Sequence, residues 1–156
     1  MKIRILQVGK NKDAYISEVS TEFIKRISPY AKVEIFEFPE CATSKTVSAE
    51  VAIASEAQSI LKNINDDDFV IVLYEKGKEI TSIEFSKFIS EKKDFGKSLC
   101  FIVGGPFGLD KSVMDRADFL LSFSKMTFTH LMIRIFLLEQ IYRAFAIIHG
   151  KGYHHE

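Results

Sequence analysis

Segment 130–149 restricts the possible folds of this chain more than any other part of the sequence. Its spacing predicts a helix with apolar residues on every side, namely Leu131, Met132, Ile133, Ile135, Phe136, Leu137, Leu138, Ile141, Ala144, Phe145, Ile147 and Ile148. A helix without a wide polar face has to be covered all round. We therefore expect the core of the chain on one flank and a second copy of the chain on the other. Thr129 is expected to cap this helix, and Gly150 to end it in a left-handed conformation.

Three charged residues show that this helix does not cross a membrane. Arg134, Glu139 and Arg143 interrupt the apolar run, so it lacks the charge-free stretch of about 18 residues that a membrane span needs. The first ten residues do not resemble a secretion signal. Cys41 and Cys100 are far apart, match no metal spacing and are typical of reduced thiols. These features predict a cytoplasmic protein, and a length of 156 residues predicts a single domain.

The rest of the chain alternates between strand and helix patterns. The predicted strands cover residues 2–8, 32–38, 69–74, 98–103 and 117–121. The predicted helices cover residues 13–27, 48–63, 81–92 and 110–116, before the last one at 130–149. Strands that alternate with helices favour an α/β fold, with a mostly parallel sheet and helices on both faces.

Ligands of parallel α/β sheets bind beyond the carboxyl ends of the strands, which draws attention to three loops. They follow Leu73, Val103 and Leu121. The loop Gly104-Gly-Pro-Phe-Gly108 lets the backbone approach a ligand closely, although a tight structural turn explains the same residues. It lacks the G-x-G-x-x-G and Gly-Lys-Ser/Thr patterns, which argues against a dinucleotide-binding enzyme of the doubly wound type.

The loop 122–129 leads into the last helix, whose first N–H groups are available to an acceptor on a ligand. The hydroxyl groups of this loop, together with Met126 and Phe128, suit an adenosine-like ligand. Capping of the helix and packing in the core would account for the same residues.

Polar residues on the last helix and in the tail are further candidates. His130 and Arg134 share one flank of the helix, and Glu139 and Arg143 share nearly the opposite one. Glu139 and Arg143 have the spacing of a surface ion pair, but charges in so apolar a helix also indicate a subunit junction or a site. The tail Tyr153-His154-His155-Glu156 has two adjacent histidines without a third ligand nearby, so we expect no metal site. The tail is either a mobile terminus or a group that stacks on a nucleotide base.

The formal net charge of the chain is zero, but the charges are unevenly distributed. Basic residues are in excess in segments 1–33 and 85–156, whereas acidic residues dominate segment 34–84. A nucleic-acid partner would therefore have to bind a local patch made by the two ends of the chain. A protein without such a partner is equally compatible with this balance.

Several motifs together resemble one family over the whole chain. They are KIRILQVGK at residues 2–10, VGGPFGL at 103–109, LSFSKMTF at 121–128, HLMIRIFLLEQIYRA at 130–144, and the terminal Tyr153-His154. These motifs are similar to those of the ribosomal RNA large subunit methyltransferase H family, which belongs to the SPOUT class of methyltransferases. Members of this family use S-adenosylmethionine to methylate N3 of a pseudouridine in 23S ribosomal RNA of the assembled ribosome.

The resemblance implies a C-terminal deep trefoil knot and a homodimer, and it implies no metal and no membrane. It also implies which residues hold the methyl donor: Leu73, Gly105, Ser124, Lys125, Met126, Thr127, Phe128 and Thr129. The family often has proline at the position of Thr129 and a basic residue at that of His155, so this chain departs from the pattern at both positions.

The catalytic residues that the resemblance implies lie in the last helix and the tail. Tyr153 and His154, supplied by the opposite subunit, would place the pseudouridine, and His155 occupies the basic position of the tail. Glu139 and Arg143 would order the site, with His154 or Glu139 as a candidate proton acceptor. The expected partner is 23S ribosomal RNA in the large subunit of the 70S ribosome. The alternative is a non-catalytic ribosome- or RNA-binding factor with a vestigial donor pocket.

Overall fold

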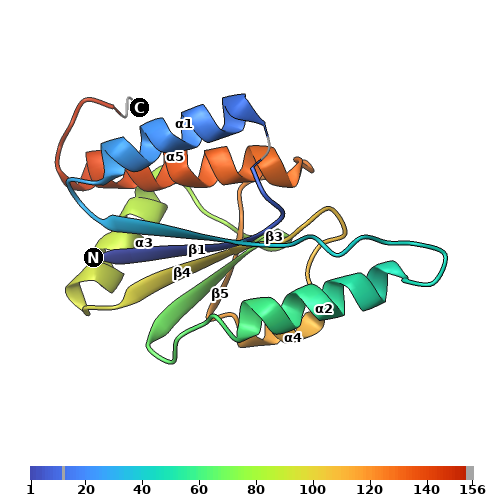
Figure 1. Cartoon of the computed structure of the whole chain (residues 1–156). Helices are drawn as coiled ribbons and strands as arrows, with labels where there is room; N and C mark the ends of the chain where they lie inside the picture. The colour runs from blue at the N-terminus through green and yellow to red at the C-terminus, as the bar shows by residue number, and fades with distance from the viewer. Residues whose placement is uncertain (12, 154–156) are drawn as a thin grey trace.

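The computed structural model describes residues 1–11 and 13–153, and a parallel β-sheet forms its centre (Figure 1). Its five strands are β1 (Lys2–Val8), β2 (Lys32–Phe38), β3 (Asp68–Glu79), β4 (Ser98–Val103) and β5 (Phe119–Ser122). They lie in the order β2-β1-β4-β3-β5, and every pair of neighbouring strands is parallel. The predicted α/β class is confirmed, and the sheet is parallel throughout.

The helices cover both faces of the sheet, as the sequence predicts. They are α1 (Ala14–Ile27), α2 (Ala49–Leu61), α3 (Ser82–Asp94), α4 (Lys111–Arg116) and α5 (His130–Ile148). Figure 1 shows α1 and α5 side by side above the sheet, and α2 with α4 below it. Helix α3 packs beside α5, so α1, α3 and α5 share one face. The domain is thus a three-layer sandwich.

Each face of the sheet has its own apolar core, because side chains alternate between the two faces along a strand. One core packs Ile3, Ile5 and Phe101 of the sheet against α3 and α5. The other packs Leu6 and Ile102, with other strand residues, against α2 and α4. Strands β1 and β4 are buried on both faces, which explains their nearly continuous apolar sequences.

Local capping explains where the helices begin. The side chain of Asp13 accepts a hydrogen bond from the backbone N–H of Tyr15 at 2.9 Å. Thr129 accepts from the N–H of Met132 at 3.3 Å, so the predicted cap of the last helix is confirmed. Gly150 follows α5 with φ +62°, the left-handed conformation expected there.

Strand β3 is longer than the sequence predicts. We expected it to end at Tyr74, but the strand continues to Glu79. Leu73 and Lys78 both pair with Leu121 of β5, and the register shifts between these two pairings. A Cβ atom on Gly77 would stand 2.8 Å from the carbonyl carbon and oxygen of Leu120. Gly77 therefore allows two backbones to touch, a requirement that periodicity does not reveal.

The chain itself covers more of α5 than we expected. The sheet lies beneath this helix, and α1 and α3 flank it. The partly open side chains include an outer line at helical spacing, namely Met132, Phe136, Glu139, Arg143 and Ile147, with Gln140 and Tyr142 beside it. The predicted contact with a second copy of the chain would therefore use only part of the surface of this helix.

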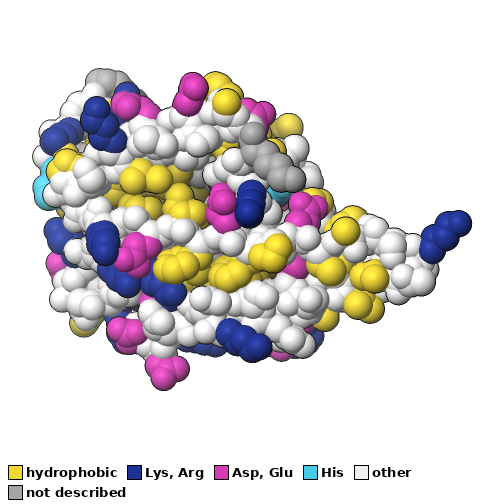
Figure 2. All heavy atoms as spheres, in the orientation of Figure 1, with side chains coloured by type: hydrophobic (Ala, Val, Ile, Leu, Met, Phe, Trp, Pro, Cys, Tyr) yellow, Lys and Arg dark blue, Asp and Glu magenta, His cyan; other side chains and the backbone are white. Residues whose placement is uncertain are grey.

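The segment between β2 and α2 protrudes from the body of the domain (Figure 2). Its side chains from Ala42 to Thr46 are exposed. Hydrophobic side chains are visible on both sides of the edge strand β2 in the same view. This protruding segment follows the carboxyl end of β2, so it lies at the edge of the sheet where ligands of parallel α/β folds bind.

Candidate active site

A cavity of about 800 Å³ opens at the carboxyl ends of β3, β4 and β5. Its walls come from the three loops that the sequence singled out, together with the first turn of α5. The lining residues are Leu73–Glu75, Val103–Leu109, Leu121–Ser124 and Met126–Leu131, with Ile133. A volume of several hundred cubic ångströms and a largely apolar wall are typical of sites for small molecules and cofactors.

The glycine-rich loop after β4 forms one wall of the cavity. Gly105 and Gly108 form an isolated antiparallel bridge, with a backbone hydrogen bond of 3.1 Å from the N–H of Gly108 to the carbonyl of Gly105. Gly108 has φ +87°, and a Cβ atom on Gly104 would stand 2.8 Å from Cγ of Leu109. The loop is therefore both a tight turn and a cavity wall, so the two explanations of its glycines are compatible.

The loop after β5 forms the opposite wall and is held by its own hydroxyl groups. Ser122 donates to the backbone carbonyls of Glu75 and Ser124 at 3.1 and 2.9 Å. The backbone N–H of Met126 donates to Oγ of Ser124 at 2.9 Å, and Thr127 donates to the carboxylate of Glu75 at 3.4 Å. These bonds fix the path of the loop and join it to the end of β3.

Large apolar side chains stand exposed around the mouth of the cavity. Phe107, Met126 and Phe128 line it, and Met132 lies one turn into α5. Met126 is 72% exposed. Phe128, in the same loop, packs edge to face against Phe136 of α5. Exposed apolar side chains gathered at one site usually mark a surface that a ligand or a partner covers.

Of the residues predicted to bind the donor, seven line this cavity: Leu73, Gly105, Ser124, Met126, Thr127, Phe128 and Thr129. Lys125 lies instead in a neighbouring hollow with Glu75, Lys76, Gly77 and Glu79. The loop bends at Lys125 and Met126, and Lys125 therefore lies on this second hollow although its neighbours line the cavity.

The predicted residues of α5 and the tail form a second cluster. The guanidinium of Arg143 donates through Nε to Oε1 of Glu139 at 3.0 Å, and Nη2 is paired with the same oxygen. The hydroxyl of Tyr153 donates to this oxygen at 3.3 Å, and the Arg143 guanidinium lies over the Tyr153 ring, 4.8 Å from its centre. Burial, assisted by the charge of Glu139, raises the pKa of Tyr153. The cluster thus fixes Tyr153 as a neutral phenol.

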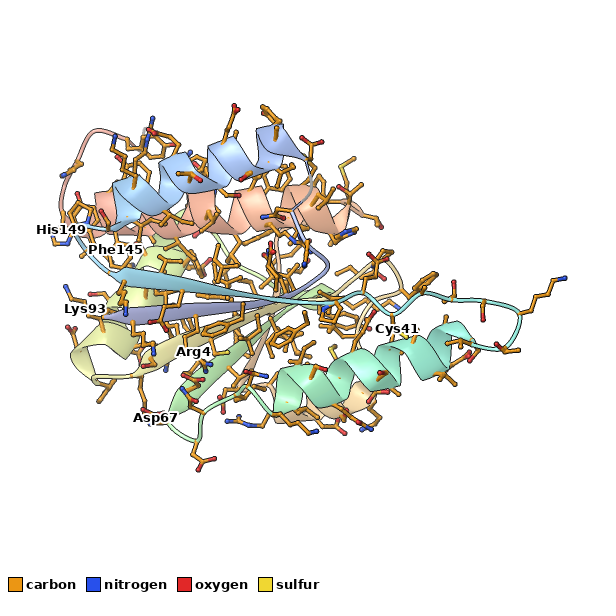
Figure 3. All side chains as sticks on the ribbon, viewed as in Figure 1. Arg4, Cys41, Asp67, Lys93, Phe145 and His149 are labelled. Carbon is orange, nitrogen blue, oxygen red and sulfur yellow. The ribbon has the colours of Figure 1, made fainter. Side chains whose placement is uncertain are left out.

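This tail cluster lies far from the cavity of its own chain. The cavity is at the beginning of α5, and Arg143 lies 13 residues after His130, which is about 20 Å along a helix. Figure 3 shows the two ends of α5 on opposite sides of the domain, with His149 and Phe145 at the far end. His154 and His155 lie outside the described residues, so the structure says nothing of their positions.

The predicted site residues do not include the carboxylate of Glu75 or the imidazole of His130, which both lie on the cavity wall. Glu75 directly follows the predicted strand 69–74, and that position was a usable signal. His130 was noted only as a neighbour of Arg134 on the helix. Burial, with help from the charge of Arg134, lowers the pKa of His130, while Glu40 opposes this shift. His130 is therefore a neutral imidazole at neutral pH.

The part of the chain that the structure describes contains no candidate metal site. Among residues 1–11 and 13–153, no three His, Cys, Asp or Glu side chains come together as a possible metal site. Within the same residues, no helix is long and apolar enough to cross a membrane. The cavity consequently offers hydroxyl groups, backbone groups and apolar surface to a ligand.

A parallel α/β sheet with a cavity at its carboxyl edge is an architecture that methyltransferases share with many other enzymes, and sequence comparison distinguishes among them. Residues 1–154 match the family described as "Predicted SPOUT methyltransferase". The chain belongs to this family, and within it to the ribosomal RNA large subunit methyltransferase H proteins. The resemblance found in the sequence motifs is thereby confirmed.

The relatives match along nearly the whole chain. "Ribosomal RNA large subunit methyltransferase H" of Carboxydothermus hydrogenoformans is 47% identical, over 99% of this chain and 99% of that protein. The protein of the same name from Enterococcus faecalis is 44% identical, again over 99% of both chains. A "Putative ribosomal RNA large subunit methyltransferase H" of Methanococcus maripaludis is 46% identical with the same coverage.

A solved structure supports the fold. It is "a probable methylase family protein from Haemophilus influenzae Rd KW20", with a TM-score of 0.56 and 14% sequence identity. The match covers 99% of this chain and 70% of that one. At this identity the similarity concerns the fold alone.

Proposed function

We propose that this protein transfers the methyl group of S-adenosylmethionine to N3 of a pseudouridine in 23S ribosomal RNA of the assembled ribosome. The observation that carries the proposal is the cavity of about 800 Å³ between the glycine-rich loop and the first turn of α5, in a chain of this family. The names of its relatives state that they act on large-subunit ribosomal RNA.

The cavity walls fit the methyl donor. Leu73 and Phe128 offer apolar surface for an adenine ring, and the hydroxyls of Ser124, Thr127 and Thr129 suit the ribose and amino-acid groups. S-adenosylmethionine supplies an activated methyl group on a sulfonium, so the protein has only to align the target nitrogen and remove its proton.

The active form in this proposal is a homodimer in which the tail of one copy serves the cavity of the other. About 20 Å of helix separates the Glu139–Arg143–Tyr153 cluster from the cavity of the same chain. A two-fold dimer through the mouth of the cavity would cover the exposed Phe107 and Met126 and bring a second tail close. Glu139 and Arg143 then position Tyr153 for the target base.

The proposal also includes a knotted C-terminal region. Leu121 of β5 pairs with Leu73 and with Lys78, so β5 contacts two separate parts of β3. Gly77 lies directly against the backbone of β5 between them. This contact supports a chain path in which the end of the molecule passes through the loop that follows Leu73.

The partner in this proposal is the ribosome, which places the protein in the cytoplasm. The target base has to leave its stack in an RNA loop before its N3 can reach the cavity. Because the chain has no net charge, binding would rely on the shape of the ribosome and on local basic residues rather than on overall attraction.

The direct test is methyl transfer from labelled S-adenosylmethionine to whole ribosomes and to naked 23S RNA. The expected result is label in ribosomes and on N3 of one pseudouridine. Absence of label from both substrates, with donor binding intact in calorimetry, would instead support the non-catalytic ribosome- or RNA-binding factor.

A further inference from the structure

The reaction under "Proposed function" requires a group that accepts the proton of the target N–H, and the cavity wall contains few candidates. The cavity-lining residues with a side chain that titrates are Tyr74, Glu75 and His130. The hydroxyl of Tyr74 is a phenol, which accepts protons in enzymes less often than an imidazole or a carboxylate. The choice within one chain is therefore between Glu75 and His130.

Glu139, the other candidate from the sequence, is already engaged. Its Oε1 accepts from Arg143 and from the hydroxyl of Tyr153, and its Oε2 accepts from Gln140 at 2.7 Å. A carboxylate that accepts several hydrogen bonds beside a guanidinium is a poor base, because these contacts stabilise its charged form. Glu139 fits a positioning role.

The surroundings of Glu75 and His130 differ in a way that favours the imidazole. The side chain of Glu75 is exposed at the mouth of the cavity and accepts a hydrogen bond from Thr127. His130 is half-buried at the first position of α5, immediately after the Thr129 cap. A half-buried imidazole on the cavity wall is better placed as a base than a carboxylate exposed to solvent at the mouth, and imidazole is the side chain that most often moves protons in enzymes.

Arg134 explains why His130 stays neutral and in place. It lies one turn further along α5, is almost fully buried, and donates to the carbonyl of Val8 and to Oδ1 of Asn11. Two carboxylates act on this guanidinium, Glu37 of β2 and Glu40 of the segment after it. Oε2 of Glu40 and Nη2 of Arg134 both lie close to the Cβ position of Gly9, at 3.5 and 3.4 Å. The fixed guanidinium disfavours a second positive charge on the imidazole, whereas Glu40 limits this effect.

We infer that His130 is the catalytic base of the methyl transfer and accepts the proton of the target pyrimidine N–H inside the cavity of its own subunit. This inference rests on the function proposed above. The ring N–H gives its proton to the imidazole, and the nitrogen keeps the electron pair. A bond forms between this nitrogen and the methyl carbon as the carbon–sulfur bond breaks, and its electron pair stays on sulfur as a neutral thioether. The imidazolium then releases its proton to water.

The test compares the pH dependence of single-turnover methyl transfer on ribosomes for the wild type, His130→Gln and Glu75→Gln. We expect the wild-type rate to rise with pH up to the pKa of His130, below about 6.5, and then to level off. His130→Gln should lower the rate at pH 7 by about 10²- to 10⁴-fold and abolish the plateau, so that the rate continues to rise with pH.

The matched control is His149→Gln, which changes the exposed histidine at the other end of the same helix. It should keep both the rate and the plateau. Calorimetric titration with S-adenosylmethionine and thermal melting verify that each variant folds and binds the donor. As a second variant, His130→Gly should regain activity when neutral imidazole is added.

Two results would overturn the inference while leaving the proposed function intact. In one, His130→Gln binds the donor and transfers methyl within about threefold of the wild type, with the plateau unchanged. In the other, Glu75→Gln abolishes the plateau and His130→Gln does not. Failure of the wild type to methylate any RNA would instead overturn the proposed function itself.

Discussion

Arg4 of β1 and Asp68, the first residue of β3, form an ion pair that is almost completely buried. The side chain of Arg4 is 5% exposed and that of Asp68 0%. Arg4 also donates to the carbonyl of Asn63 at 2.7 Å, and the N–H of Asn65 donates to Asp68 at 2.9 Å. Figure 3 shows Arg4 within the sheet on the side of α2. The pair thus ties the turn after α2 to two strands of the sheet.

Removal of one partner should destabilise the fold strongly. Asp68→Ala leaves a buried guanidinium without its counter-ion, and we expect the free energy of unfolding to fall by about 3–5 kcal/mol in urea denaturation. The control is Asp115→Ala, which breaks the exposed pair with Lys111 and should change stability by less than about 1 kcal/mol. Equal losses in the two variants would contradict a structural role for the buried pair.

Cys100 lies next to this ion pair, and the thiol should be inert in the folded protein. Burial, assisted by the charge of Asp68, raises the pKa of Cys100 to about 12. Because only the thiolate reacts, a thiol reagent at pH 8 should modify half-buried Cys41 and leave Cys100 unmodified until the protein unfolds. Mass spectrometry of the labelled peptides measures which cysteine is modified first. Fast labelling of Cys100 in native buffer would contradict the prediction that its thiol is inert.

The sequence predicted the sheet because its signals are local. Strands such as 98–103 are apolar runs bounded by turn residues, and caps such as Thr129 precede an apolar period of 3.6 residues. The cavity followed from the rule that ligands bind at the carboxyl ends of parallel strands. These features depend on residues that are close together in the chain.

What the sequence left open depends on residues that are far apart in the chain. The backbone contact between Gly77 and Leu120 and the place of His130 on the cavity wall are set by how the loops pack in space. The Arg4–Asp68 pair spans 64 positions, and Lys125 turns away from the cavity although its neighbours line it. No periodicity encodes such contacts, because each depends on the assembled sheet.

Gly77→Ala should destabilise the fold strongly, because this residue lies directly against the backbone of β5. The added Cβ would stand 2.8 Å from backbone atoms of Leu120 and Leu121, which cannot move without disturbing β5. We expect a loss of more than about 3 kcal/mol in urea denaturation, or no soluble protein. Gly152→Ala is the control, since no atom of residues 1–11 and 13–153 lies within 4 Å of its Cβ position. A folded Gly77→Ala variant of unchanged stability would rule out the close approach of β3 and β5.

Glu56 should make the stability of the fold depend on pH. This buried carboxylate of α2 accepts from the backbone N–H of Cys41 at 2.8 Å, and burial raises its pKa, with a further contribution from Glu40. The ionised form of Glu56 is therefore less favourable in the folded than in the unfolded state. The contribution of Glu56 to the free energy of unfolding is greatest below the unfolded pKa of about 4.3, and it falls as the pH rises through the folded pKa.

The substitution that tests this is Glu56→Gln, which keeps an acceptor for Cys41 and removes the charge. It should raise the free energy of unfolding by up to about 1 kcal/mol at pH 7 and have little effect near pH 4. Urea denaturation at the two pH values measures the difference. An equal gain in the free energy of unfolding at both pH values would show that the charge of Glu56 is not the cause.

The tail should act on the cavity of the other subunit. Removal of residues 151–156 deletes Tyr153 and its contacts with Glu139 and Arg143, and it should abolish methyl transfer while donor binding stays intact. Thr127→Trp should fill the cavity and abolish donor binding instead. Each variant alone is therefore expected to be inactive, for different reasons.

Mixing these two inactive variants distinguishes action within a subunit from action between subunits. In a mixed dimer, the open cavity of the shortened chain would meet the complete tail of the Thr127→Trp chain. Random pairing makes half of the dimers mixed, each with one complete site, so about a quarter of the wild-type rate should return. If the tail served its own cavity, no mixture would recover activity, because neither chain then has both parts. We expect methyl-transfer activity to recover in the mixture, because α5 holds the tail about 20 Å from the cavity of its own chain.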